Sequence, residues 1–391
     1  MRPVAQQSVP DPLPVSAVAR SSERNGGYPR LYRAVREAGL LERRRASYLG
    51  RIAVTALAFV AAAVGFVAIG DSWWQLLSAA VFAVFFAQFG FIGHDAGHRQ
   101  IFSSRRANDV VGYVHGDLLI GLGYGWWVGK HLAHHANPNH ETHDPDVNLG
   151  VLAFTAEQSS DPAGERGAVG RFVIRHQAAL FFPLLLLEGV DLHVSAVRSL
   201  VRGKVPARGL ETVLLAAHAA AYTVAILSVL SPGKALLFVV VHQGLFGLYL
   251  GCSFAPGHKG MPMPTAADRL DPLRRQVLTS RNVVGGPFVD LALGGLNYQI
   301  EHHLFPRMPR PNLRRAQPLV REFCRREGLP YVETGLRDSY ARALGHLRTV
   351  SAPARSAGAN RGGGRCTRAA PTSTSTSRAR WRWSSTAPGS R

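Results

Sequence analysis

Four long runs without charged residues constrain the fold of this chain more than any other feature. The hydrocarbon core of a bilayer is about 30 Å thick, and an α-helix crosses it in about 20 residues. Backbone polar groups in that core need partners within the protein, so apolar runs of this length predict helices. A short turn separates the runs of each pair, which predicts two helical hairpins. The runs cover residues 52–70, 75–93, 212–230 and 235–252.

The chain is strongly basic, but the distribution of its charge argues against a nucleic-acid binder. Lys and Arg outnumber Asp and Glu by 45 to 25, which gives a net charge of +20. Residues 351–391 contain eight arginines and no acidic residue, and many other arginines flank the apolar runs. Basic residues beside hydrophobic spans are typical of cytoplasmic loops. Cys252, Cys324 and Cys366 match no disulfide or zinc-site spacing.

The arginine-rich segment before the first run places the N-terminus in the cytoplasm. Each hairpin then returns the chain to that side of the membrane. Residues 178–187 form a further apolar run, but it holds only ten residues and contains Pro183. We interpret this run as interfacial or re-entrant, because it is too short to cross a bilayer. A third crossing here would place the C-terminal region on the opposite side.

Three further segments complete the expected architecture. Residues 30–48 have amphipathic helical spacing with a basic face, which is typical of a helix on the membrane surface. Residues 110–128 are apolar but contain His115 and Asp117, which indicates a buried or partly embedded helical segment. Residues 311–350 predict soluble helices that close a cytoplasmic cap.

The two ends of the chain differ from the rest in composition. Residues 1–27 are rich in Pro, Ser and Gln and lack the apolar core of a signal peptide. Residues 351–391 are rich in Arg, Ala, Gly, Ser and Thr, which cannot build a core. We therefore expect both ends to be disordered and residues 28–350 to form one domain.

Three histidine-rich clusters contain seven of the sixteen histidines and adjoin apolar stretches. Within a cluster the histidines are adjacent or three to four residues apart, so one helix face presents them together. Imidazole is a common ligand of iron, zinc and copper, and polar groups at membrane depth are usually functional. The clusters are His94 with His98; His131, His134 and His135; and Gln299 with His302 and His303.

The number of imidazoles constrains the metal centre. Seven exceed the needs of one four-coordinate zinc and suit two metal ions with open positions. Only Asp95 and Glu301 supply carboxylates within the clusters, and we expect them to orient imidazoles. A nitrogen-rich site of this kind favours iron-based oxygen chemistry. The alternative, a metal transporter, predicts histidines along the spans, where only His218 and His242 lie.

These patterns together predict an all-α integral membrane protein. Four transmembrane helices form two hairpins, and a cytoplasmic helical cap holds a histidine-ligated dimetal site.

The sequence around the clusters resembles the membrane fatty acid desaturase family. HDAGH, WWVGKHLAHHANPN and GGLNYQIEHHLFPRMPR are similar to that family's three histidine boxes. Gln299 stands where many members have His, which resembles the front-end and bacterial acyl-CoA or acyl-lipid members. SFAPGHKGM is similar to a stretch that supplies one further ligand, although Gly257 replaces the usual Asn. The resemblance implies no catalytic residue beyond the metal ligands His94, His98, His131, His134, His135, His258, His302 and His303, with Gln299 as an additional candidate.

The resemblance also implies a reaction. Two iron ions and O2 would insert a cis double bond into the acyl chain of a lipid or an acyl-CoA. The sequence contains no His-Pro-Gly-Gly haem motif, so we expect a separate ferredoxin or cytochrome b5-like carrier to supply electrons. A bacterial plasma membrane is the expected location, with both termini and the boxes in the cytoplasm. A related lipid hydroxylase or ketolase would have similar boxes and is the alternative within this chemistry.

Residues outside the boxes are expected to have structural roles. The other histidines are interpreted as surface or packing residues, of which His115 and His143 lie nearest the boxes in sequence. Asp144-Pro-Asp146 is interpreted as a capped turn. Four arginines are expected to be exposed, where they follow the positive-inside rule or attract an acidic electron donor or acyl headgroup. They are Arg274, Arg275, Arg314 and Arg315.

Overall fold

The computed structural model describes residues 27–148, 150–160 and 166–355. Helices dominate this part of the chain, and two three-residue strands form its sheet. The predicted disorder of residues 1–26 and 356–391 lies outside the described residues.

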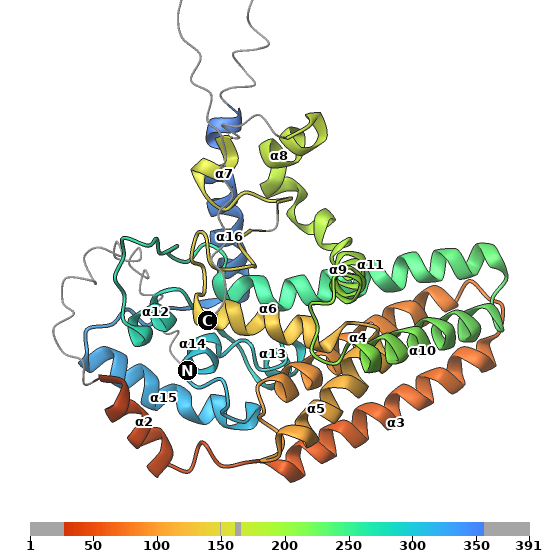
Figure 1. Ribbon diagram of the computed structural model, residues 1–391, viewed down its shortest axis with the longest axis horizontal. Helices are drawn as coiled ribbons and strands as arrows, with labels where there is room; N and C mark the ends of the chain where they lie inside the picture. Colours follow the sequence, from red (N-terminus) through yellow and green to blue (C-terminus); the bar gives the residue numbers. More distant parts are fainter. Residues whose placement is uncertain (1–26, 149, 161–165, 356–391) are drawn as a thin grey trace, which may run out of the picture.

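Four helices are long and apolar enough to cross a membrane, and they lie side by side in Figure 1. Each contains most or all of one predicted apolar run. The helices are α3 (Arg45–Ile69), α4 (Gln75–Gly97), α10 (Arg208–Leu227) and α11 (Pro232–His258). An integral membrane protein built on helices is therefore confirmed. Helices α4 and α11 continue past the ends of their apolar runs into histidine-containing sequence.

Aromatic side chains fill the space between these helices. Phe66 of α3, Phe82 of α4 and Phe238 of α11 are buried together, with ring centroids 5.3–6.3 Å apart. The opposite face of α3 is exposed and apolar; Leu57, for example, is 70% exposed. A helix that exposes Leu and Val in this way suits contact with lipid.

The predicted short apolar run lies in a bent helix pair. Helix α8 (Ala168–Leu185) contains Pro183 near its C-terminus, and α9 (Glu188–Val201) leaves it at an angle of 82°. Proline removes a backbone donor and disrupts the last turn, which explains a break at this point. The pair has the composition of either a broken span or a re-entrant loop. In Figure 1, α8 lies beside α16 (Leu336–Val350), and its C-terminal end, with Leu185, packs against α11.

The segment between the first two boxes enters the helical bundle, as expected for residues 110–128. Helix α5 (Arg105–Tyr113) continues as the π-helix η1 (Val114–Leu119), and α6 (Tyr124–Ala136) follows. His115 and Asp117 on η1 are buried.

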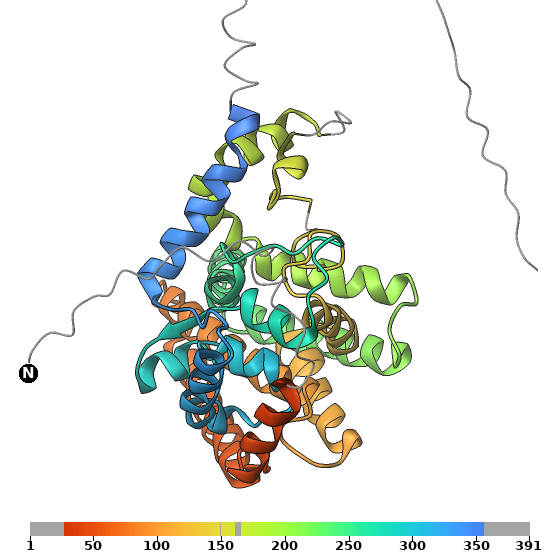
Figure 2. The ribbon, with the colours of Figure 1, turned by 90° about the vertical axis from the view of Figure 1, so that its left-hand side faces the viewer.

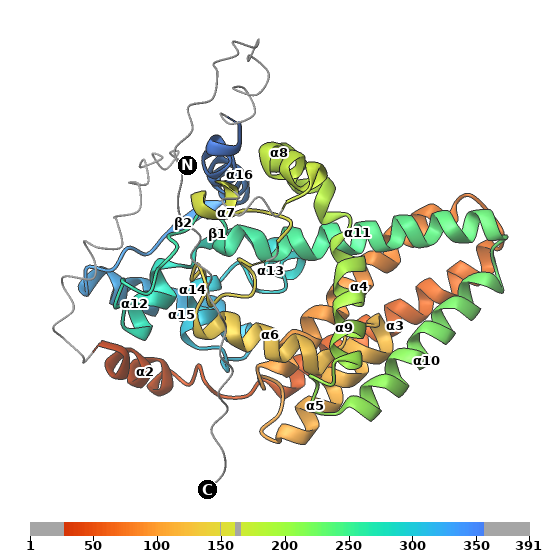
Figure 3. The same cartoon turned by 45° about the horizontal axis from the view of Figure 1, so that its top comes forward.

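The C-terminal region packs at one end of the bundle, and Figure 2 views the molecule from this side. The strands β1 (Asn282–Val284) and β2 (Glu333–Gly335) pair in parallel, and Figure 3 shows them side by side. The helices of this region are mostly short, except α15, which precedes β2. They are α12 (Pro272–Leu278), α13 (Pro287–Ala292), α14 (Gln299–Leu304) and α15 (Arg310–Arg326); α7 (Ala156–Ser160) lies beside α16.

The expectation of one surface helix over residues 30–48 is wrong. Helix α2 (Gly27–Glu37) ends before Gly39, whose φ of 67° is left-handed, and α3 begins only at Arg45. Leu31 and Val35 are buried against α15 instead of facing lipid. The apolar face of α2 therefore belongs to a protein core.

Candidate metal centre

Four segments that are distant in sequence bring the histidine clusters together. His94 lies in the last turn of α4, and His98 caps the C-terminus of that helix. The second cluster occupies the C-terminal half of α6, and the third lies on α14. His258 is the last residue of α11. The helix extensions beyond the apolar runs thus place these ligand candidates at one end of the bundle.

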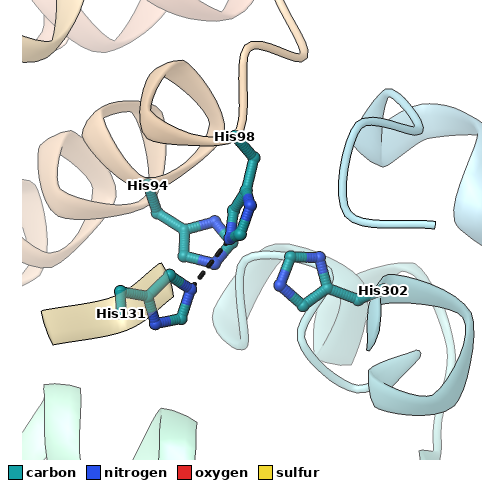
Figure 4. A group of neighbouring side chains, drawn as sticks. All are labelled: His94, His98, His131 and His302. Carbon is teal, nitrogen blue, oxygen red and sulfur yellow. Dashed lines mark hydrogen bonds between the residues drawn. The ribbon is translucent and has the colours of Figure 1, made fainter. Parts of the chain in front are cut away.

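The first group consists of four imidazoles whose nitrogen atoms lie within 4.8 Å of one another. Figure 4 shows that the rings of its members converge from α4, α6 and α14. The Nε2 atoms of His98 and His131 are 2.8 Å apart. The group contains His94, His98, His131 and His302.

The second group adjoins the first and contains His134, His258 and His303. His258 Nε2 lies 2.9 Å from His303 Nε2 and 3.3 Å from His134 Nε2. Gln299 is also present, with its Nε2 2.7 Å from His258 Nε2. Gly257 leaves room for it, because a Cβ there would lie 2.8 Å from Gln299 Cγ.

His135 lies between the two groups. Its ring stacks on His303 at 4.1 Å and meets His98 of the first group at 4.5 Å, measured between ring centroids. All eight histidines implied by the resemblance, together with Gln299, therefore lie in one continuous cluster.

Hydrogen bonds at Nδ1 set the orientation of four of these imidazoles. Each of the four Nδ1 atoms faces an oxygen acceptor, so the proton resides on Nδ1 and the Nε2 lone pair points into the cluster. Metal-binding histidines typically donate their second nitrogen in this way. The pairs are His94 with Asp95 Oδ1 (3.2 Å), His134 with Asp144 Oδ2 (2.9 Å), His258 with the Thr279 carbonyl (2.9 Å) and His303 with Gln276 Oε1 (2.9 Å).

Burial and crowding keep the imidazoles neutral. Burial lowers the pKa of His98, His131 and His303 well below the usual range, and neighbouring imidazoles lower it further. The pKa of His135 and of His302 is lowered well below the usual range for the same two reasons. Neutral imidazole is the form that binds a metal ion.

The cluster fits a cation rather than a set of hydrogen bonds. His258 and His303 both use Nδ1 as a donor, so two Nε2 lone pairs face each other at 2.9 Å. Within the described chain, Nε2 of His94 and Nε2 of His302 are buried without any hydrogen-bond partner. Buried unpaired nitrogen atoms are costly, and coordination to metal ions would satisfy them.

Comparison with known proteins identifies the family. The sequence profile of the fatty acid desaturases matches residues 71–335. The chain belongs to the fatty acid desaturase family. The four apolar helices and the histidine cluster agree with this membership.

Individual relatives support the assignment but differ in regiochemistry. An acyl-lipid (9-3)-desaturase of Physcomitrium patens is 33% identical over 71% of this chain. A delta(8)-fatty-acid desaturase of Helianthus annuus is 27% identical over 84%, and a delta(6)-fatty-acid desaturase of Caenorhabditis elegans is 29% identical over 86%. The chain spans about half (53%) of the moss protein and about three quarters (74% and 77%) of the other two.

Asp144 lies against the histidine cluster, and the sequence alone did not point to this contact. It does form the expected turn, accepting the amide N–H groups of Asn139 and Asp146 at 2.7 and 2.8 Å. Its carboxylate is also the acceptor for His134 Nδ1. Lys130 binds the neighbouring Asp146 at 2.8 Å. The only signal for this role was an acidic pair soon after the second box.

The two carboxylates within the boxes have different roles. Asp95 contacts His94 as expected, and it also forms a buried ion pair of 2.5 Å with Arg310 of α15. The expectation that Glu301 orients an imidazole is wrong. Glu301 accepts hydrogen bonds from Asn282 and Tyr331, and burial raises its pKa to about 7.

Arg281 stabilises the end of α11 that carries His258. Its fully buried guanidinium donates to the carbonyl oxygens of Pro256, Lys259 and Ser339 at 2.7–3.2 Å. Proline in the last turn and the end of the helix leave carbonyl groups that need such a partner.

Other predicted roles have mixed outcomes. His115 and His143 lie outside both histidine groups, since His115 contacts the Val111 carbonyl and His143 contacts His140. Arg274 and Arg275 are half-buried rather than exposed, with contacts to Asp271 and to the Ala136 carbonyl, respectively. Arg314 and Arg315 are exposed as expected.

Proposed function

We propose that this desaturase inserts a cis double bond into a fatty acyl chain, using O2 and two electrons. The observation that carries the proposal is the convergence of eight histidines, seven in two adjacent groups and His135 between them. We assign two iron ions as the occupants, because nitrogen-rich sites with open positions suit iron in oxygen chemistry. The ligands are the eight histidines and, as a candidate, Gln299.

The side chains around the cluster have defined tasks. Iron bound there would supply the oxidising power that removes hydrogen from unactivated methylene groups. Asp95 and Asp144 hold His94 and His134 in the tautomer that directs Nε2 inward. Trp127 stacks on His131, with ring centroids 4.5 Å apart, and covers one face of that imidazole. Rigid support of this kind would keep the acyl chain and the metal ions in a fixed position relative to one another.

We further propose that the four spans form two hairpins and that the cluster faces the cytoplasm. The three boxes occupy one site, so the chain between the second and third boxes must cross the membrane an even number of times. Helices α10 and α11 account for two crossings. The bent pair α8–α9 therefore stays on the side of the boxes, as an interfacial or re-entrant element.

The region from α12 to α16 then forms the cytoplasmic cap of a single domain spanning residues 28–350. Exposed arginines such as Arg314 and Arg315 on this cap would attract an acidic ferredoxin or a cytochrome b5-like donor. The acyl carrier is a membrane lipid or CoA. The basic segment before α3 supports a cytoplasmic cap, in a bacterial plasma membrane, under the positive-inside rule.

Lipid analysis of cells that express the protein tests the reaction. Mass spectrometry should find acyl chains with one additional double bond at a defined position. We expect His303→Ala to abolish this product, because His303 belongs to the second histidine group. His176→Ala, on the exposed face of α8, is the matched control and should retain activity.

Two results would contradict the proposal. A new hydroxyl group without a new double bond would show the chemistry of a lipid hydroxylase. Full activity of a well-expressed His303→Ala protein would show that the histidine cluster is not the reaction centre.

A further inference from the structure

Helix α13 exposes the apolar side chains of one face, and Val284, the last residue of β1, is exposed three residues before the helix begins. Phe288 is 79% exposed, Val284 59% and Leu291 51%. The opposite face is polar and turned toward the protein, where Asp290 accepts a hydrogen bond of 2.8 Å from Asn297 Nδ2. Arg314 of α15 lies 3.8 Å from the same carboxylate. The segment is therefore amphipathic, and no described residue covers its apolar face.

Contacts with the membrane-spanning helices fix the depth of this segment. Gln88 of α4 donates to the Leu291 carbonyl at 3.3 Å, and Tyr249 of α11 donates to the Ala292 carbonyl at 2.8 Å. Gly294, with a φ of 60°, lies so close to α4 that a Cβ there would be 2.4 Å from the Phe91 ring. The C-terminal end of α13 is thus held against α4 and α11.

These contacts lie within the apolar length of the spans. Gln88 is thirteen residues from the start of α4, or about 20 Å at 1.5 Å per residue. Tyr249 is seventeen residues from the start of α11, or about 26 Å. Both values are smaller than the hydrocarbon thickness of about 30 Å. The end of α13 is therefore level with the hydrocarbon of the nearer leaflet.

The side chains around Tyr249 continue this apolar surface. Tyr249 also lines an apolar groove of about 300 Å³ between α4 and α11, together with Ala83, Leu248 and Cys252. The groove opens on the outside of the bundle, where the spans expose Val and Leu to lipid. The apolar face of α13 thus adjoins an exposed apolar surface of the membrane-spanning helices.

We infer that α13 inserts into the hydrocarbon of the leaflet nearest the histidine cluster and that lipid acyl chains cover Val284, Phe288 and Leu291. The carbonyl groups of Leu291 and Ala292 at the end of the segment accept hydrogen bonds from the spans, as burial at membrane depth requires. Gln299 begins α14 seven residues after Ala292, so lipid contact at α13 seats the segment that carries the third box. Contact between α13 and lipid does not depend on which reaction the protein catalyses.

Site-directed spin labelling of the full chain tests this contact. Nitroxide labels are attached at Phe288→Cys or Leu291→Cys, in a background where Cys252, Cys324 and Cys366 are alanine. The protein is reconstituted into bilayers of phosphatidylcholine and phosphatidylglycerol, and collision with O2 and with a water-soluble nickel chelate is measured. Leu319→Cys, 38% exposed on α15, is the aqueous control, and Val60→Cys, 57% exposed on α3, is the lipid control.

We expect the labels at positions 288 and 291 to behave like the label at 60, with O2 collision several-fold more frequent than nickel collision. Nickel access equal to that at position 319 would overturn the inference, because it would place the face in water. Low access to both reagents, with spin–spin broadening between copies, would overturn it as well, because a second chain would then cover the face. Two labelled positions keep the test informative if one variant expresses poorly.

Discussion

Arg310, the last residue of the third box segment, supports the first histidine group from α15. Its guanidinium binds Asp95 at 2.5 Å and the Phe91 carbonyl at 2.6 Å, and both charged side chains are at least nine-tenths buried. Removing one partner of a buried ion pair leaves an uncompensated charge and costs about 3–5 kcal/mol. The charge of Arg310 therefore keeps Asp95 available to hold His94.

We predict that Arg310→Gln lowers both the melting temperature and the iron content of the purified protein, while Arg310→Lys partly restores iron binding. Iron per chain and thermal unfolding in detergent measure the two effects. Arg314→Gln is the matched control, since Arg314 is exposed and a surface ion pair contributes only about 0–1 kcal/mol. Unchanged iron content in Arg310→Gln would contradict this role.

At the residue scale, the sequence identified the histidines that cluster better than the side chains that support them. Histidine spacing and the resemblance to the family's boxes were sufficient to select the eight histidines that cluster. Short-range pattern determines which residues share a helix face. Arg310 lies 215 positions after Asp95, and no local pattern links the two. Glu301 was misassigned for a similar reason, since its partners Asn282 and Tyr331 come from β1 and from the chain before β2.

At the scale of elements, the existence of the four spans was predictable but their ends were not. The length of an apolar run is enough to indicate a membrane crossing. The position of a helix end depends instead on capping and on contacts with other segments. Helix α11 runs to His258 because Arg281 binds carbonyl oxygens at its end. The break between α2 and α3 has one signal in the sequence. Gly39 lies at this break and adopts the left-handed conformation that is common after helices.

The bent pair α8–α9 gives a prediction at this scale. If the pair does not cross the membrane, both of its ends lie on the side of the histidine cluster. Cysteines at Val169 and Val201, which are 78% and 73% exposed, should react with a membrane-impermeant maleimide only from the cytoplasmic side. A cysteine at Trp73, 61% exposed in the turn between α3 and α4, should react only from the opposite side.

Labelling of positions 169 and 201 from different sides would show a fifth crossing. That result would separate the third box from the other two and would contradict a shared site.

At the scale of the whole molecule, the site depends on spans and cap together. Helices α4 and α11 bring His94 and His258 to the end of the bundle, and α6 and α14 bring the remaining histidines to the same place (Figures 1 and 4). The sequence predicted this meeting through the parity of the crossings. It could not predict the division into two groups, because that division depends on side-chain geometry across four segments.

The iron content of the purified full chain tests the central claim most directly. After anaerobic loading with ferrous iron and desalting, we predict about two iron atoms per chain, as two adjacent imidazole groups imply. His302→Ala and His303→Ala affect different groups, so each should lower the ratio to about one. A wild-type protein that retains one iron atom or none, or two variants that both keep the wild-type ratio, would contradict a dimetal centre built from the three boxes.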